Sequence, residues 1–198
     1  MLRTKILASL AISAAWAQPS QAATFVFFGQ LSGANEVPPV ASPGIGSARV
    51  TYDDVANTLL IAFDFAGLLG TTTMAHIHCC TPPGANVGVA TPVPNLPGFP
   101  LGVLAGSSST TLDLTLASSF NPAFVNANSG LEGARTRLIN GLFAGQAYFN
   151  VHSTSFPGGE LRANLTAVPE PATWAMMIAG FAGVGGVLRA RRGVPAAA

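Results

Sequence analysis

The sequence predicts an all-β domain, an antiparallel β-sandwich with one short helix, and three observations predict this class. Short apolar and β-branched runs alternate with turn residues along the middle of the chain. The 198 residues include 22 glycines and 15 prolines, which favour many turns over long helices. Only one stretch, residues 131–143, repeats its apolar side chains at helical spacing, and Gly145 follows as a stop signal.

Seven stretches have the pattern of strands: 24–31, 46–53, 58–65, 74–79, 109–116, 148–152 and 160–165. The short polar segment 53–57 indicates a hairpin between the second and third stretches. Residues 81–101 are rich in proline and glycine and almost uncharged, so we expect a long loop of the kind that often borders a site. Together these elements predict one domain over residues 24–167.

Charged residues make up only 9% of the chain, against 49% hydrophobic residues. Between residues 23 and 168 four arginines stand against seven acidic residues, a net charge of −3, and there is no lysine. Nucleic-acid binding needs a basic surface, so we expect no nucleic-acid partner.

The first 22 residues have the pattern of a secretory signal peptide. Arg3 and Lys5 precede the apolar run 6–16, and Ser20-Gln21-Ala22 offers small residues at cleavage spacing. The apolar run is too short to span a bilayer well. We therefore expect export into an oxidising compartment.

The C-terminal segment, residues 168–198, has a different composition from the domain. Residues 172–188 are apolar and rich in glycine, and the basic run 189–192 follows them. This pattern predicts a transmembrane helix over 172–188, with its basic end in the cytoplasm and the domain outside.

Histidines are concentrated at two places. His76 and His78 alternate along one predicted strand and share a face, as do Asn150 and His152 on another. If the two strands are neighbours, three imidazoles converge, and this ligand set suits copper or zinc.

Two interpretations of the histidines stay open. In the first, His76, His78 and His152 bind a metal, and Glu160 or Glu36 is a fourth ligand or orients a ligand. In the second, the histidines belong to a buried polar network in which Glu36, Asn150 and Glu160 satisfy the imidazoles; the buried polar groups need partners in either case.

Cys79 and Cys80 are the only cysteines of the chain. In an exported protein they can form a vicinal disulfide with each other or pair with a second molecule. Alternatively, a cysteine thiolate could bind the same metal as the histidines. No nucleophile–base arrangement, phosphate-binding loop or paired carboxylates appear, so we expect no enzyme.

The tail resembles the Pro-Glu-Pro sorting signal of Gram-negative bacteria. It carries Pro169-Glu170-Pro171, then Trp174-Ala175, the apolar stretch and the basic end, in that order. The resemblance implies recognition by an exosortase, membrane attachment through the helix before processing, and delivery to the cell surface, outer membrane or extracellular matrix.

The body resembles a CHRD domain, the module named after chordin. The resemblance rests on 31–39 (LSGANEVPP), 75–78 (AHIH), 145–152 (GQAYFNVH) and 157–162 (PGGELR), in this order. It implies an immunoglobulin-like or superoxide-dismutase-like Greek key and an extracellular binding or structural module without established catalysis.

Two functional hypotheses follow. The first is a non-catalytic surface or matrix module that is sorted by its tail and binds an exopolysaccharide or a surface protein. The alternative is a metal-dependent redox or hydrolytic protein that uses His76, His78 and His152 with copper or zinc.

Overall fold

The structure is a computed structural model that describes residues 23–169, 178–182, 184 and 189. Between residues 23 and 169 the chain forms eight strands, two α-helices and two short 3-10 turns, η1 (Gly33–Asn35) and η2 (Ala117–Ser119). The strands are β1 (Thr24–Ser32), β2 (Ile45–Asp53), β3 (Thr58–Ala66), β4 (Thr72–Cys79), β5 (Gly106–Asp113), β6 (Ala147–Ser153), β7 (Leu161–Asn164) and β8 (Thr166–Val168). The helices are α1 (Pro122–Ala127) and α2 (Leu131–Phe143).

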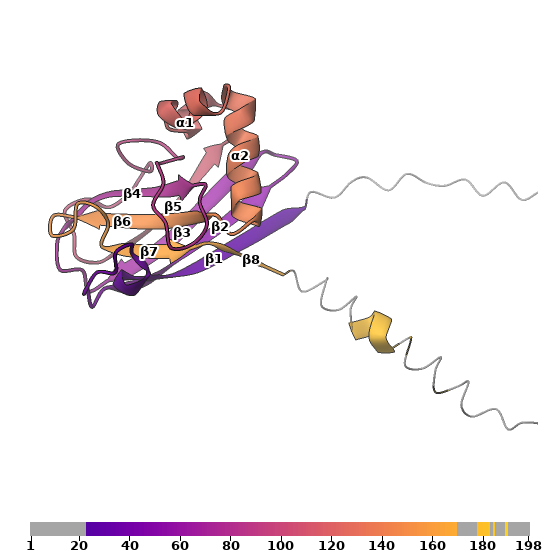
Figure 1. The fold of residues 1–198 in the computed structure, drawn as a ribbon, viewed down its shortest axis with the longest axis horizontal. Helices are drawn as coiled ribbons and strands as arrows, with labels where there is room; N and C mark the ends of the chain where they lie inside the picture. The colour runs from indigo at the N-terminus through magenta and orange to yellow at the C-terminus, as the bar shows by residue number, and fades with distance from the viewer. Residues whose placement is uncertain (1–22, 170–177, 183, 185–188, 190–198) are drawn as a thin grey trace, which may run out of the picture.

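All strands belong to one curled antiparallel sheet in the order β4-β6-β7-β1-β2-β3-β5, and β8 pairs with the outer part of β1 (Figure 1). Long ladders run through β1, β2, β3 and β5, whereas β1 and β7 share a single registered pair, Ser32 with Arg162. The sheet therefore has two halves, β4-β6-β7 and β1-β2-β3-β5, that are joined by a short junction.

The core lies between the two halves of the sheet. Phe63 of β3 and Phe149 of β6 are not on neighbouring strands, yet their rings stack with centroids 5.0 Å apart. The alternation of side chains along a strand explains which residues reach the core: Leu59, Ile61 and Phe63 all point inward from β3 and are buried. Burial of these large apolar side chains, worth roughly 1.5–3 kcal/mol each, holds the halves together.

The helices lie together beyond one end of the strands, and α2 packs against β6 and β8 (Figure 1). Helix α1 begins at Pro122 behind Asn121, whose side-chain oxygen accepts a hydrogen bond from the backbone N–H of Ala123. Its six residues are too few for a periodic pattern, which is why only α2 was expected from the sequence.

The structure confirms the all-β antiparallel class with few helices, and it corrects the prediction in three ways. The strands form one continuous curled sheet instead of two separate sheets, the described domain has two α-helices, and the strand expected at 109–116 is β5, three residues earlier. The immunoglobulin-like or dismutase-like topology stays a prediction.

Both targeting segments fall largely outside the described residues. The expected signal peptide, 1–22, lies there entirely, and so does most of the expected transmembrane stretch 172–188. Among the residues that are described, no helix is long and apolar enough to cross a membrane, so the structure gives no support to the predicted transmembrane helix.

Candidate metal centre

Strands β4 and β6 carry the three histidines on one face of the sheet. The register pairs His76 with Asn150 and His78 with Tyr148. His152 lies two residues beyond Asn150 along β6, opposite Met74. The opposite face of the same strands carries Ala75, Ile77 and other core residues. Because side chains alternate along a strand, one face of β4-β6 builds the hydrophobic core while the other gathers the imidazoles.

Each imidazole uses one ring nitrogen for a hydrogen bond to a loop carbonyl. Nε2 of His76 lies 2.6 Å from the carbonyl oxygen of Pro94, and Nδ1 of His78 lies 2.8 Å from that of Val87. Nδ1 of His152 lies 2.9 Å from the carbonyl oxygen of Pro157. A carbonyl oxygen can only accept, so each of these nitrogens is the N–H donor, and the other nitrogen of each ring keeps a free lone pair.

The free nitrogens are Nδ1 of His76, Nε2 of His78 and Nε2 of His152, and all three are buried without a hydrogen-bond partner. The side chains that carry them are 3%, 9% and 7% exposed, respectively. One nitrogen from each of these residues lies within 4.8 Å of the others. Three buried nitrogens without partners in one cluster of rings are costly in a folded protein unless a cation or a proton donor lies among them.

Burial also keeps the three rings neutral. Desolvation lowers the pKa of His76 and His152, and lowers the pKa of His78 to about 4, although the hydrogen bonds to the carbonyls act in the opposite direction. Neutral imidazole is the form that binds metal ions, so the rings need release no proton at neutral pH.

The arrangement fits a small transition-metal ion. Metal–nitrogen bonds of about 2.0–2.1 Å would bring the ligand nitrogens to about 3.3–3.6 Å from one another, so the rings would close by roughly 1 Å. The second ring nitrogen of each histidine is already bonded to a carbonyl, which is the usual way that a metal-binding histidine is oriented.

A stack of three planar groups fixes His78. Its ring lies on that of Tyr148, with centroids 4.7 Å apart and planes inclined by 6°, and the guanidinium of Arg162 lies 3.8 Å from the centroid of Tyr148. The Tyr148 hydroxyl lies 3.3 Å from the Val87 carbonyl oxygen, the same atom that accepts from His78. The stack therefore orients both the imidazole and its acceptor.

Glu36 and Asn150 lie beside the histidines in a polar network. The amide nitrogen of Asn150 donates to Glu36 and to the carbonyl oxygen of Leu161, and Nε of Arg162 lies 3.4 Å from a Glu36 oxygen. Burial raises the pKa of Glu36, while Asn150 and Arg162 oppose this change. A side chain at Gly159, where φ is +131°, would collide with the side chains of Asn150 and Glu36, so the glycine is required there.

Glu160 does not join the histidine cluster, contrary to the sequence-based expectation of a ligand. Its carboxylate accepts from the Ser42 hydroxyl at 2.7 Å and from the backbone N–H groups of Leu69 and Gly70 at 2.6 and 3.3 Å. Burial would raise the pKa of Glu160, but these bonds and one from Ser153 together lower it. Glu160 ties the 67–71 loop to the start of β7.

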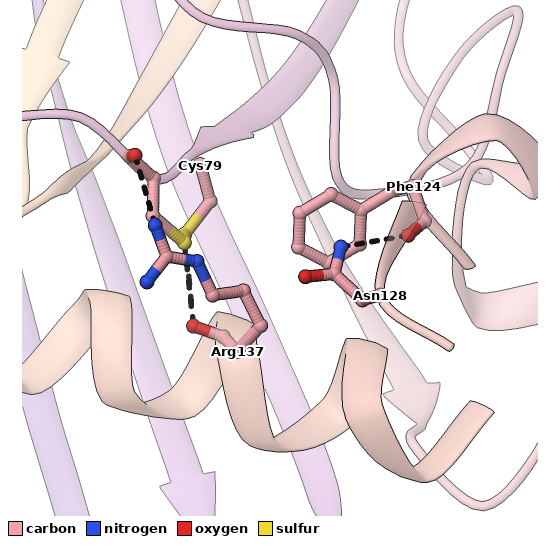
Figure 2. Close-up of a disulfide and its surroundings, with 5 residues drawn as sticks. Cys79, Phe124, Asn128 and Arg137 are labelled. Atoms are coloured by element: carbon pink, nitrogen blue, oxygen red, sulfur yellow. Dashed lines mark hydrogen bonds between the residues drawn. A yellow bond between two sulfur atoms is a disulfide. The ribbon is translucent and has the colours of Figure 1, made fainter. Parts of the chain in front are cut away.

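Cys79 and Cys80 form a vicinal disulfide at the end of β4. Figure 2 shows Cys79 beside Arg137 of helix α2. The Cys80 sulfur lies 3.3 Å from the carbonyl oxygen of Arg137, and the Arg137 guanidinium donates to the Cys80 carbonyl. Both sulfurs also lie against Gly141. Since the sulfurs are bonded to each other and lie on the far side of β4 from the imidazoles, neither is a thiolate ligand in this structure.

Several groups at the site were not identified from the sequence. Tyr148 and Arg162 could have been found, because alternation places Tyr148 on the face of Asn150, and Arg162 shares a face with Glu160. The carbonyls of Val87, Pro94 and Pro157 carry no signal, since any residue in a loop offers the same acceptor.

Comparison with known proteins identifies two regions of the chain. The CHRD domain family matches residues 27–165, which include every residue of the histidine cluster, and the PEP-CTERM protein-sorting motif matches residues 167–192. No curated protein and no solved structure gives a significant match. The CHRD match covers more than half of the chain, and the protein therefore belongs to the CHRD domain family and carries a C-terminal PEP-CTERM sorting motif.

Proposed function

We propose that this protein is a non-catalytic module of the cell surface or extracellular matrix, sorted by an exosortase, that binds one metal ion through His76, His78 and His152. The CHRD domain and the sorting motif indicate an exported, exosortase-sorted protein of a Gram-negative bacterium. The observation that carries the metal-binding part is the convergence of three buried ring nitrogens without hydrogen-bond partners.

The end of the domain is suited to such sorting. Strand β8 pairs with β1 through residues 166–168, and Pro169 follows at once. The domain is therefore complete in hydrogen bonding where the sorting motif begins, and cleavage after this point would leave the sheet intact. Transient attachment to the membrane through residues 172–188, before cleavage, belongs to the proposal.

The rival function is a metal-dependent redox or hydrolytic enzyme at the same histidines. The surroundings favour binding without hydrolysis, because the two buried carboxylates near the site are already engaged. Glu36 is paired with Asn150 and Arg162, and Glu160 accepts from Ser42, Leu69 and Gly70. Neither is free to act as a general base toward a metal-bound water.

The sorting part is tested by changing Pro169 and Pro171 to alanine in a Gram-negative strain that has an exosortase, and in one that lacks it. We expect the unchanged protein to be shortened and delivered to the surface only in the first strain. The variant should stay full-length and remain in the membrane fraction. Unchanged processing and delivery of the variant would refute sorting by this motif.

The metal-binding part is tested by elemental analysis of the exported protein after incubation with copper and with zinc. We expect about one ion per chain, lost in the His76→Ala/His78→Ala variant and retained in Glu132→Gln, a control on the exposed face of α2. A cooperative thermal melt of each variant shows that it is folded. Absence of bound metal in the unchanged protein, or equal metal in both variants, would refute the proposal.

A further inference from the structure

The three-histidine cluster offers ligands without any charge, and this limits which ion it suits. Each imidazole donates one N–H to a carbonyl, and its other nitrogen is buried without an acceptor for a second proton, which matches the neutral ring. In the described part of the chain no aspartate, glutamate or cysteine joins the cluster. The site therefore gives a bound ion nothing to cancel its charge.

The buried carboxylates around the cluster are directed away from it. Arg162 and Glu36 face each other at 3.4 Å, so their charges oppose, and the Glu160 carboxylate lies outside the cluster and accepts hydrogen bonds from Ser42 and Leu69. The three histidines are 9% exposed or less, so water screens the ion poorly. The cost of placing an ion in such a medium rises with the square of its charge, so a divalent ion pays about four times the desolvation penalty of a monovalent one.

Coordination number leads to the same conclusion. Zinc takes four ligands, and with three histidines it needs a water or hydroxide, whose protons in turn need acceptors. The nearby buried carboxylates are occupied. Imidazole is a good ligand for both metals, so the preference rests on the charge of the ion and on its number of ligands: a monovalent copper ion can be held by the three neutral nitrogens alone.

We propose that His76, His78 and His152 form a copper(I) site that discriminates against zinc(II) through the absence of a negative ligand. This inference rests on the proposed metal binding and adds the identity and oxidation state of the ion. The discriminating feature is the neutral donor set enclosed on the polar face of β4 and β6.

Titration of the exported mature protein, without its signal peptide, tests the inference without any variant. Copper(I) is added under nitrogen in competition with bicinchoninate, and zinc(II) is added separately in competition with a zinc-binding dye. We expect one copper(I) per chain, at least 10³-fold tighter binding of copper(I) than of zinc(II), and displacement of preloaded zinc by one equivalent of copper(I). Zinc that stays bound after this addition would overturn the inference while leaving the proposed metal binding intact.

A single added carboxylate tests the charge argument. In His152→Asp, and independently in His78→Asp, the ratio of copper(I) to zinc(II) affinity should fall at least 100-fold, whereas Ser109→Asp on the exposed face of β5 should leave it unchanged. A cooperative melt selects the variants that fold. An unchanged ratio in a folded variant would overturn the inference, and no binding of either ion by the unchanged protein would overturn both this inference and the proposed function.

Discussion

Replacing Gly141 by alanine should destabilise the protein even though alanine is the better helix former. Gly141 lies inside α2 with both disulfide sulfurs against it, and a Cβ there would lie 2.5 Å from the Cys80 sulfur, 3.2 Å from its Cβ and closer still to the Cys79 sulfur. Optimal contacts between heavy atoms lie at about 3.5–4.0 Å, so the overlap is about 1 Å or more. Neither the helix backbone nor a bridged pair of cysteines moves as a flexible side-chain tip would.

The magnitude follows from two opposing effects. Overpacking of this kind costs about 1–3 kcal/mol, and the gain in helix propensity from glycine to alanine is about 0.8–1.0 kcal/mol. We therefore expect a net loss of about 1 kcal/mol, and at most about 2 kcal/mol, in the free energy of unfolding, measured by urea denaturation of the oxidised protein. Asn140→Ala, at an exposed position of the same helix, is the control and should be neutral or slightly stabilising.

A double-mutant cycle isolates the contact with the sulfurs. In a Cys79→Ala/Cys80→Ala background the same Gly141→Ala change should be neutral or stabilising by up to about 1 kcal/mol, because both sulfurs are gone and only the Cβ of residue 80, at 3.2 Å, remains close. The reasoning is refuted if Gly141→Ala has the same effect in both backgrounds, or if it stabilises the oxidised protein.

The remaining predictions concern the polar face. The metal-free protein should lose stability as the pH falls from about 6.5 towards 4, because the histidines of the unfolded chain take up protons before those of the folded protein do. For His78 the fall in pKa from 6.5 to about 4 corresponds to roughly 3 kcal/mol in the free energy of unfolding. A melting temperature that stays constant across this pH range would contradict the argument. Copper at about 100 times its dissociation constant should raise the melting temperature by about 5–10 °C, and no rise in the calorimeter would contradict binding to the folded state. Arg162→Met should lower the free energy of unfolding, measured by urea denaturation, by about 3–5 kcal/mol, because it leaves Glu36 buried without its partner. Glu36→Gln combined with Arg162→Met should recover part of this loss. An Arg162→Met variant as stable as the unchanged protein would show that the pair does not stabilise the fold. Gly159→Ala should destabilise through its positive φ and the collision with Asn150 and Glu36, and an unchanged melting temperature would refute this.

Some features of the site were predictable because they depend on local periodicity. The strand pattern placed His76 and His78 on one face and His152 with Asn150 on another, and the register of β4 with β6 brings these faces together. Helix α2 was expected at 131–143 and lies there, since its apolar repeat is long enough to be specific. Its neighbour α1, only six residues long, was not.

Other features depend on distant parts of the chain and could not be predicted. Glu160 was expected near the histidines, yet Ser42 and the 67–71 loop supply its donors from more than 80 residues away. The carbonyls that fix the three tautomers come from separate loops whose residues carry no chemical signature. The choice between two sheets and one curled sheet rests on a single registered pair between β1 and β7.

By itself the sequence determined the antiparallel β class, the CHRD family, the sorting motif and the identity of the three histidines, because alternation, turn residues and short motifs are local properties of a chain. Only the tertiary structure decided that the free nitrogens of these histidines converge, that Glu160 stays apart from them, and that the disulfide lies against Gly141. These outcomes depend on how the sheet curls and how its loops close over one face, and that is a balance of contacts between residues far apart in sequence.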